Sequence, residues 1–176
     1  MNKVITQIDS RGVAQVTLNN PDKHNAFDDQ MIIQLTEAFH TVAANPDVRI
    51  MLLKSEGKSF SAGADLEWMK RMASYSYQQN LNDARALAAM LKALHQMPIP
   101  TIARVQGAAF GGAIGLISCC DIALASSNAS FALSEVKIGL VPSTISPYVI
   151  AAIGERHAKR YFMTAERFDA NTALQI

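Results

Sequence analysis

The sequence predicts an α/β fold built on a mostly parallel sheet, and two observations carry this prediction. Short apolar or alternating segments, which are typical of strands, occur at residues 13–18, 48–54 and 101–106. Longer segments with apolar side chains at helical spacing lie between them, beginning near Asp28 and near Gln79. Strands that alternate with helices are joined by crossovers and pair in parallel. Because the sequence has no internal repeat and no linker-like stretch, we expect residues 1–176 to form one domain.

The N-terminal elements are separated by turn-forming residues. Residues 2–9 are predicted to form a strand, and residues 13–18 a second one, because apolar and polar side chains alternate there. A turn at residues 19–22 (NNPD) ends this strand, and a helix begins at Asp28 or Asp29. Its buried positions are expected to be Met31, Leu35, Ala38, Phe39 and Val42.

The middle of the chain continues the same alternation. Residues 48–54 form a mostly apolar run that predicts a buried strand, and a loop is expected at residues 57–63. An apolar segment at residues 66–72 follows, and a helix is predicted from Gln79 to His95 because prolines come directly after it.

The C-terminal half predicts further alternation. A glycine-rich turn at residues 107–113 leads into a short helix that ends near Asp121. Strands are expected at residues 121–125 and 129–133. A helix is expected at residues 146–164, since proline is favourable in its first turn.

Composition excludes several classes of protein. Hydrophobic residues make up 49% and charged residues 18%, and the formal net charge is +1, so we expect no nucleic-acid partner. No apolar run is long enough to span a membrane, and the first residues do not resemble a signal peptide. The adjacent Cys119 and Cys120 are unsuited to pair with each other and indicate reduced thiols. A soluble, cytoplasmic protein is therefore expected.

Several common chemistries lack their sequence pattern. Neither G-x-G-x-x-G nor G-x-S-x-G occurs, and the Gly57-Lys58-Ser59 segment resembles the end of a Walker A loop but has Leu52 where the first glycine is required. The histidines are scattered and have no metal-ligand spacing, so no metal site is expected. They are His24, His40, His95 and His157.

Two turns rich in small residues are the remaining candidates for a site. Residues 61–65 (SAGAD) and 107–113 (GAAFGGA) each follow a predicted strand and lead toward a helix. Small side chains let a ligand approach the backbone, and unpaired N–H groups at a helix start attract negative charge. Both segments could equally be tight turns or points of close helix packing.

Four separated segments together resemble the crotonase (enoyl-CoA hydratase/isomerase) family. They are residues 59–66 (SFSAGADL), 98–112 (PIPTIARVQGAAFGG), 120–123 (CDIA) and 131–142 (FALSEVKIGLVP). The resemblance implies a β/α superhelix, an acyl-CoA substrate, a homotrimer or dimer of trimers, and no cofactor besides the coenzyme A of the substrate. Family members continue beyond the point where this sequence stops, so the usual C-terminal helices are expected to be lacking.

The resemblance also implies roles for particular residues. The N–H groups of Ala64 and Gly112 are expected to form an oxyanion hole, and Glu135 is expected to be the principal acid/base. Its apolar neighbours Val136 and Ile138 are expected to raise its pKa. The substrate-binding residues are expected to be Ala62, Gly63, Asp65, Leu66, Gly111 and Gly115.

Gly115 departs from the hydratase pattern, in which this position commonly carries a second catalytic glutamate. The absence of this glutamate suggests a roomier acyl pocket, although close helix packing is an alternative explanation for Gly115. The leading hypothesis is a hydratase that adds water to a 2-enoyl-CoA, and residues 107–121 and 134–150 resemble members that act on methylglutaconyl-CoA in leucine degradation. The alternatives are an enoyl-CoA isomerase, which needs only one glutamate, and a non-catalytic CoA-binding or scaffold protein.

Overall fold

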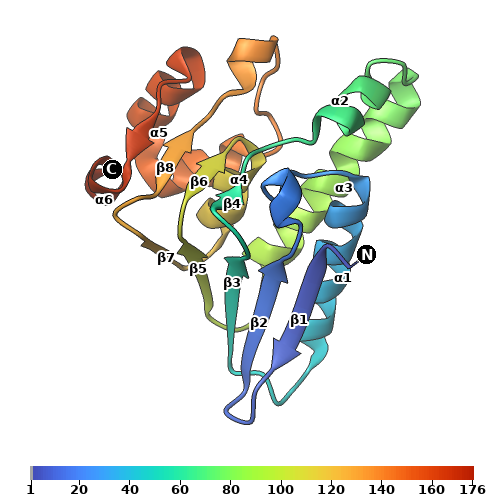
Figure 1. Cartoon of the computed structure of the whole chain (residues 1–176), viewed down its shortest axis with the longest axis vertical. Coiled ribbons are helices and arrows are strands. Elements are labelled where there is room, and N and C mark those ends of the chain that lie inside the picture. The colour runs from blue at the N-terminus through green and yellow to red at the C-terminus, as the bar shows by residue number, and fades with distance from the viewer. Residues whose placement is uncertain (1) are drawn as a thin grey trace.

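The strands of the computed structural model, which describes residues 2–176, form two sheets (Figure 1). The larger sheet has five strands in the order β1-β2-β3-β5-β7. Neighbouring strands are parallel except β1 and β2, which are antiparallel. The predicted α/β class and mostly parallel pairing are therefore confirmed. The strands of the larger sheet are β1 (Val4–Ile8), β2 (Val13–Leu18), β3 (Ile50–Ser55), β5 (Thr101–Val105) and β7 (Ile122–Ala125).

The second sheet has four short strands in the order β4-β6-β8-β9. The pairs β4–β6 and β6–β8 are parallel, and β9 is antiparallel to β8. Two of these strands lie where the sequence predicted a loop at residues 57–63 and a turn at residues 107–113. Those predictions were wrong because a three-residue strand is too short to show alternation. The strands are β4 (Ser59–Ser61), β6 (Ala108–Phe110), β8 (Ser130–Ala132) and β9 (Phe168–Asp169).

A repeating structural unit relates the two sheets. Each of β3, β5 and β7 in the larger sheet is followed directly by β4, β6 or β8 in the smaller one, and helical segments come next. Successive units place their strands side by side in both sheets. The predicted β/α superhelix is thus confirmed, although the sequence itself shows no repeat.

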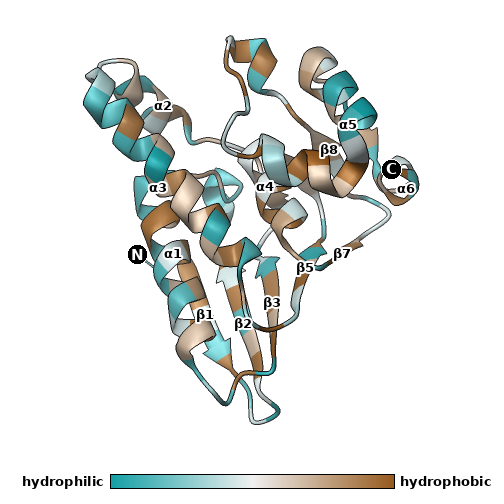
Figure 2. Cartoon of the chain, turned by 180° about the vertical axis from the view of Figure 1, so that it is seen from behind, coloured by the Kyte–Doolittle hydropathy of each residue, from teal (hydrophilic) through white to brown (hydrophobic). Residues whose placement is uncertain are grey.

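Six α-helices complete the described part of the chain. α1 and α3 lie side by side next to the larger sheet, as views from opposite sides show (Figures 1 and 2). The Asp28 carboxylate caps α1 by accepting from the Met31 N–H, and Ser76 and Gln79 form a capping box that starts α3 before the predicted residue. The helices are α1 (Asp29–Ala44), α2 (Leu66–Met72), α3 (Tyr77–His95), α4 (Gly112–Cys119), α5 (Ser146–Thr164) and α6 (Ala170–Gln175).

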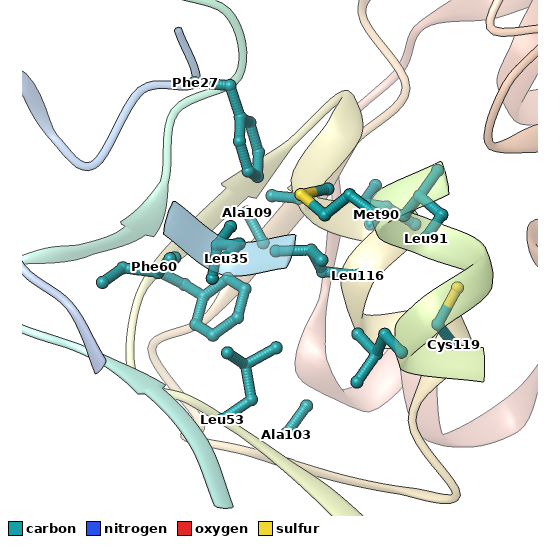
Figure 3. Packing of buried hydrophobic residues seen from close by; sticks show 14 of the residues in the cluster. Phe27, Leu35, Leu53, Phe60, Met90, Leu91, Ala103, Ala109, Leu116 and Cys119 are labelled. Carbon is teal, nitrogen blue, oxygen red and sulfur yellow. The ribbon is translucent and has the colours of Figure 1, made fainter. Parts of the chain in front are cut away.

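The main core lies between the larger sheet and helices α1, α3 and α4. All five positions of α1 that the sequence predicted to be buried are buried. Side chains from both sheets and from the helices meet in one cluster (Figure 3). This cluster fixes β4, β6 and α4, and these elements carry the two turns that the sequence identified as candidates. The residues labelled in that view are Phe27, Leu35, Leu53, Phe60, Met90, Leu91, Ala103, Ala109, Leu116 and Cys119.

Two further expectations concern thiols and membranes. Cys119 and Cys120 are unpaired, and burial raises the pKa of each thiol to about 12. They therefore remain protonated and poorly nucleophilic near neutral pH. Within residues 2–176, no helix has the length and apolar character needed to cross a membrane.

Candidate active site

The two candidate turns lie next to each other because they follow neighbouring strands. β4 and β6 are paired in parallel, with Ser61 opposite Ala109. The chain leaving β4 passes close to the end of β6, since a Cβ on Gly63 would lie 3.5 Å from the carbonyl oxygen of Phe110. Two segments more than forty residues apart in sequence therefore meet at the same edge of the smaller sheet.

The N–H of Ala64 points away from the neighbouring chain. Phe27 donates its N–H to the Gly63 carbonyl at 2.7 Å, and Asp65 donates its N–H to the Phe27 carbonyl at 2.7 Å. Phe27 and Ala64 thus form a parallel β-bridge, in which Phe27 bonds to the residues before and after Ala64. The N–H and carbonyl of Ala64 itself therefore point away from Phe27. Ala64 is exposed, and its N–H has no hydrogen-bond partner among residues 2–176.

Within the described residues, the N–H of Gly112 also has no hydrogen-bond acceptor, for a different reason. Gly112 is the first residue of α4, and the first N–H groups of a helix have no acceptor within the helix. The preceding Gly111 offers no side chain that could cap them, and its φ of 56° favours glycine. Gly111 donates its own N–H to Ala132 at 2.9 Å, which anchors the turn on β8 and leaves the Gly112 N–H available.

Glu135 lies against the same turn. It begins a short 3₁₀ helix (Glu135–Ile138) that follows β8, and a Cβ on Gly111 would lie 3.2 Å from its Oε1. Its Oε2 is buried and has no hydrogen-bond partner within the described chain. Burial raises the pKa of the Glu135 carboxyl, as the sequence predicted.

The predicted cause of that pKa shift was wrong, however. Val136 and Ile138 are 42% and 55% exposed, so they do not provide the apolar surroundings of the carboxyl group. A 3₁₀ helix turns successive side chains about 120° apart, so the neighbours of Glu135 in sequence point elsewhere. The Gly111 turn contributes to its burial, since a Cβ on Gly111 would lie only 3.2 Å from its Oε1.

The other predicted residues around Ala64 lie at the same turn but have mixed environments. Ala62 is exposed and donates its N–H to the His24 carbonyl at 3.0 Å, while Leu66 is 72% exposed. The Asp65 carboxylate is buried, caps α2 and accepts from Lys23 Nζ at 2.8 Å. The hydrogen bond from Lys23 holds the pKa of the Asp65 carboxyl below its usual range. Asp65 therefore stays ionised and supports the turn, which makes it a poor proton donor.

The roomier pocket expected at Gly115 is not present. A Cβ on Gly115 would overlap Cγ2 of Ile145, would lie 2.9 Å from Cβ of Ile145 and would lie 3.4 Å from Cδ2 of Leu91. The volume of the missing side chain is therefore already filled. Close packing of α4 against Ile145 and α3 explains the glycine, and the sequence had left this explanation open.

This packing gives a first prediction. Gly115→Ala is expected to lower the free energy of unfolding by about 1–3 kcal/mol, because the added methyl group overpacks the contact with Ile145. Ile145→Ala removes the overlapping Cγ2, so the double variant should be more stable than the sum of the two single changes implies. Urea unfolding of the four proteins measures this coupling. Strictly additive effects would show that Ile145 does not occupy the space at Gly115.

A large cavity lies elsewhere. It has a volume of about 690 Å³ and is lined mainly by residues of α4, β7, α5 and α6. None of the predicted site residues lines it. Its lining is mostly apolar, and the carboxylate of Asp121 accepts hydrogen bonds from the N–H and the hydroxyl of Thr101.

No metal site is found in the part of the chain that the structure describes. Among residues 2–176, no group of three or more His, Cys, Asp or Glu side chains could hold a metal ion.

Sequence reasoning did not identify Lys23 and Phe27, which hold the Ala64 turn. Both precede that turn by about forty residues, so no local pattern connects them with it. The only available signal was the turn at residues 19–22, which shows that the chain reverses there. Their role depends on tertiary contacts that the structure alone shows.

Comparison with known proteins identifies the family of this chain. The family model described as Enoyl-CoA hydratase/isomerase matches residues 9–176. The crystal structure of an enoyl-CoA hydratase from Shewanella pealeana is 52% identical with a TM-score of 0.97, and the match covers 99% of this chain and 65% of that one.

Two curated relatives widen the comparison. An enoyl-CoA hydratase of Alternaria alternata is 33% identical over 94% of this chain and 53% of its own length. A hexahydroindene-carboxyl-CoA hydrolase of Mycobacterium tuberculosis is 32% identical over 92% of this chain and 63% of its own length. This chain thus spans between about half and two thirds of these relatives, and their names describe more than one reaction. The match over residues 9–176 and these likenesses show that the chain belongs to the enoyl-CoA hydratase/isomerase, or crotonase, family.

Proposed function

We propose that this protein acts on acyl-CoA thioesters as an enoyl-CoA hydratase, with Ala64 and Gly112 as oxyanion donors and Glu135 as acid/base. One observation carries the proposal: two unpaired backbone N–H groups and a partly buried carboxylate gather around the Gly111–Gly112 turn. Fixed donors stabilise negative charge that develops on a carbonyl oxygen, and a carboxylate beside them can move a proton.

The arrangement suits addition of water to the double bond of a 2-enoyl-CoA. Water attacks C3 and gives a proton to Glu135, while the electron pair of the double bond moves toward the thioester carbonyl. The resulting enolate oxygen carries negative charge, which the N–H groups of Ala64 and Gly112 stabilise. Glu135 then delivers the proton to C2, so that water is added and the carboxylate is regenerated.

An enoyl-CoA isomerase is the second candidate, and the environment of Gly115 favours it. This position supplies no carboxylate, and Ile145 fills the space that one would need. Glu135 could remove a proton from C2 of a 3-enoyl-CoA and return it to C4, with the dienolate held by the same two donors. Isomerisation requires one proton carrier and no positioned water, so it makes fewer demands on the site than hydration does.

Three substrates distinguish these reactions. Crotonyl-CoA tests hydration of a straight chain, and a 3-enoyl-CoA tests isomerisation. Methylglutaconyl-CoA tests hydration of a branched acidic chain, the substrate of the family members that residues 107–121 and 134–150 resemble. In ¹⁸O-labelled water a hydratase places the label in the product hydroxyl, whereas an isomerase forms an unlabelled 2-enoyl-CoA. Mass spectrometry of the products measures the outcome. Absence of turnover with all three substrates would contradict the hydratase and the isomerase proposals together.

The raised pKa of Glu135 predicts a dependence of stability on pH. Because burial places the pKa of the folded state above the ordinary value of 4.5, the folded protein binds more protons than the unfolded chain between these two values. The free energy of unfolding should therefore fall as the pH rises through this window. Glu135→Gln cannot ionise and should lack this decrease. Urea unfolding of both proteins from about pH 4 to about pH 8, the range in which a carboxyl group with a raised pKa titrates, measures this difference. Parallel plots of unfolding free energy against pH for the two proteins would contradict the prediction.

A further inference from the structure

We infer that Phe27 is a positioning residue that fixes the two oxyanion donors relative to each other, an inference that rests on the function proposed above. The donors belong to turns on different strands, and an oxyanion hole needs both N–H groups aimed at one point. Rate losses from small displacements are large, on the order of 10²-fold for about 1 Å. A residue that contacts both turns can therefore influence catalysis without touching the substrate.

The backbone of Phe27 holds the first donor. Its N–H and its carbonyl both form 2.7 Å hydrogen bonds with the residues on either side of Ala64. These two bonds fix the orientation of the peptide groups between Gly63 and Asp65. They belong to the main chain, so a change of the Phe27 side chain leaves the groups that form them in place.

The ring of Phe27 faces the second donor. A Cβ added to Gly112 would lie 3.5 Å from both Cδ2 and Cε2 of the ring, so the ring lies about one methyl group away from the start of α4. Phe27 is 3% exposed, and its ring points from its loop toward the cluster around Met90, Ala109 and Leu116 (Figure 3). The ring therefore limits how far the start of α4 can move toward it, while the backbone of the same residue holds the other turn.

Anchors on both sides keep Phe27 in place. Asn25 is fully buried, donates from Nδ2 to the carbonyls of Glu56 at 2.8 Å and Ser59 at 3.0 Å, and accepts from the Asn20 N–H at 2.8 Å. On the other side, Asp28 caps α1 and pairs with Lys3. The main chain around Phe27 is thus fixed independently of the ring, and truncation of the ring should loosen mainly the Gly112 side.

The experiment separates positioning from a structural role by measuring carbonyl polarisation directly. Crotonyl-CoA labelled with ¹³C at the thioester carbonyl is bound to Glu135→Gln protein, in which turnover is expected to be slow, and the carbonyl stretch is recorded by infrared difference spectroscopy before turnover. Two aligned donors lower the frequency of this stretch on binding. The same spectrum is then taken with Phe27→Leu and Phe27→Ala added, and with Phe39→Leu as a control. Phe39 is another fully buried aromatic residue, and it lies on α1 outside both turns.

We expect Phe27→Leu and Phe27→Ala to lose part of the frequency shift, and Phe39→Leu to keep it. In proteins with Glu135 intact, the Phe27 variants should lower kcat roughly tenfold or more with a smaller change in KM, since the donors act mainly on the transition state. Phe27→Leu keeps most of the apolar volume and provides the test if Phe27→Ala does not fold. A full frequency shift and normal kcat in a folded Phe27 variant would overturn the inference. No shift with Glu135→Gln alone would instead overturn the proposed oxyanion hole itself.

Discussion

Glu135→Gln is expected to lower kcat by about 10²–10⁴-fold, the usual contribution of a positioned general acid/base. Glutamine keeps the shape of the side chain but cannot accept a proton from water or return one to carbon. The raised pKa makes the loss large, because a carboxyl group closer to neutral pH exchanges protons more effectively in both directions. Its Oε2 is buried and has no hydrogen-bond partner among residues 2–176, so no group in this part of the chain competes for that oxygen.

The measurement is steady-state kinetics on whichever of the three substrates the unaltered protein accepts. Glu67→Gln is the matched control, because Glu67 is a 65% exposed carboxylate on α2 that pairs with Lys70. The control should retain kcat, whereas Glu135→Gln should lose it with KM little changed. Unaltered turnover by a folded Glu135→Gln protein would assign proton transfer to another group.

Long elements could be predicted from the sequence because their signals are local. α1 has an aspartate cap, five correctly spaced apolar residues and a closing Asn-Pro-Asp turn, and all of these act within the helix itself. β3 and β5 are apolar enough to indicate burial. The short strands β4, β6 and β9 carry no such signal, since pairing with neighbours rather than local preference makes them strands.

The candidate site was predictable in composition but not in its supports. The small residues at positions 61–65 and 107–113 mark both turns, and the positive φ of Gly111 gives a physical reason for one of them. The filled space at Gly115 depends on Ile145, which is 30 positions away, and the support from Phe27 depends on two other strands. Such contacts form only when the chain folds, so no local pattern could show them.

Gly112→Pro is expected to lower kcat by about 10²–10³-fold, the typical effect of removing one oxyanion donor. Proline has no N–H, so the change deletes the proposed donor itself. The position should tolerate it, because Gly112 is the first residue of α4, where proline is favoured and no helical hydrogen bond is lost. The φ of 56° and ψ of −122° at Gly111 mirror the extended conformation preferred before proline, and the achiral glycine adopts either form.

Gly112→Ala is the control that makes this test specific. Its Cβ would lie 3.5 Å from the Phe27 ring, an ordinary contact, and its N–H is retained. Circular dichroism and urea unfolding should show that both variants are folded, while only the proline variant loses kcat. The thioester carbonyl stretch of bound crotonyl-CoA should also move toward its value in water in the proline variant alone, because one donor no longer polarises it. If folded Gly112→Pro protein keeps both its turnover and the shifted carbonyl stretch, the Gly112 N–H is not an oxyanion donor.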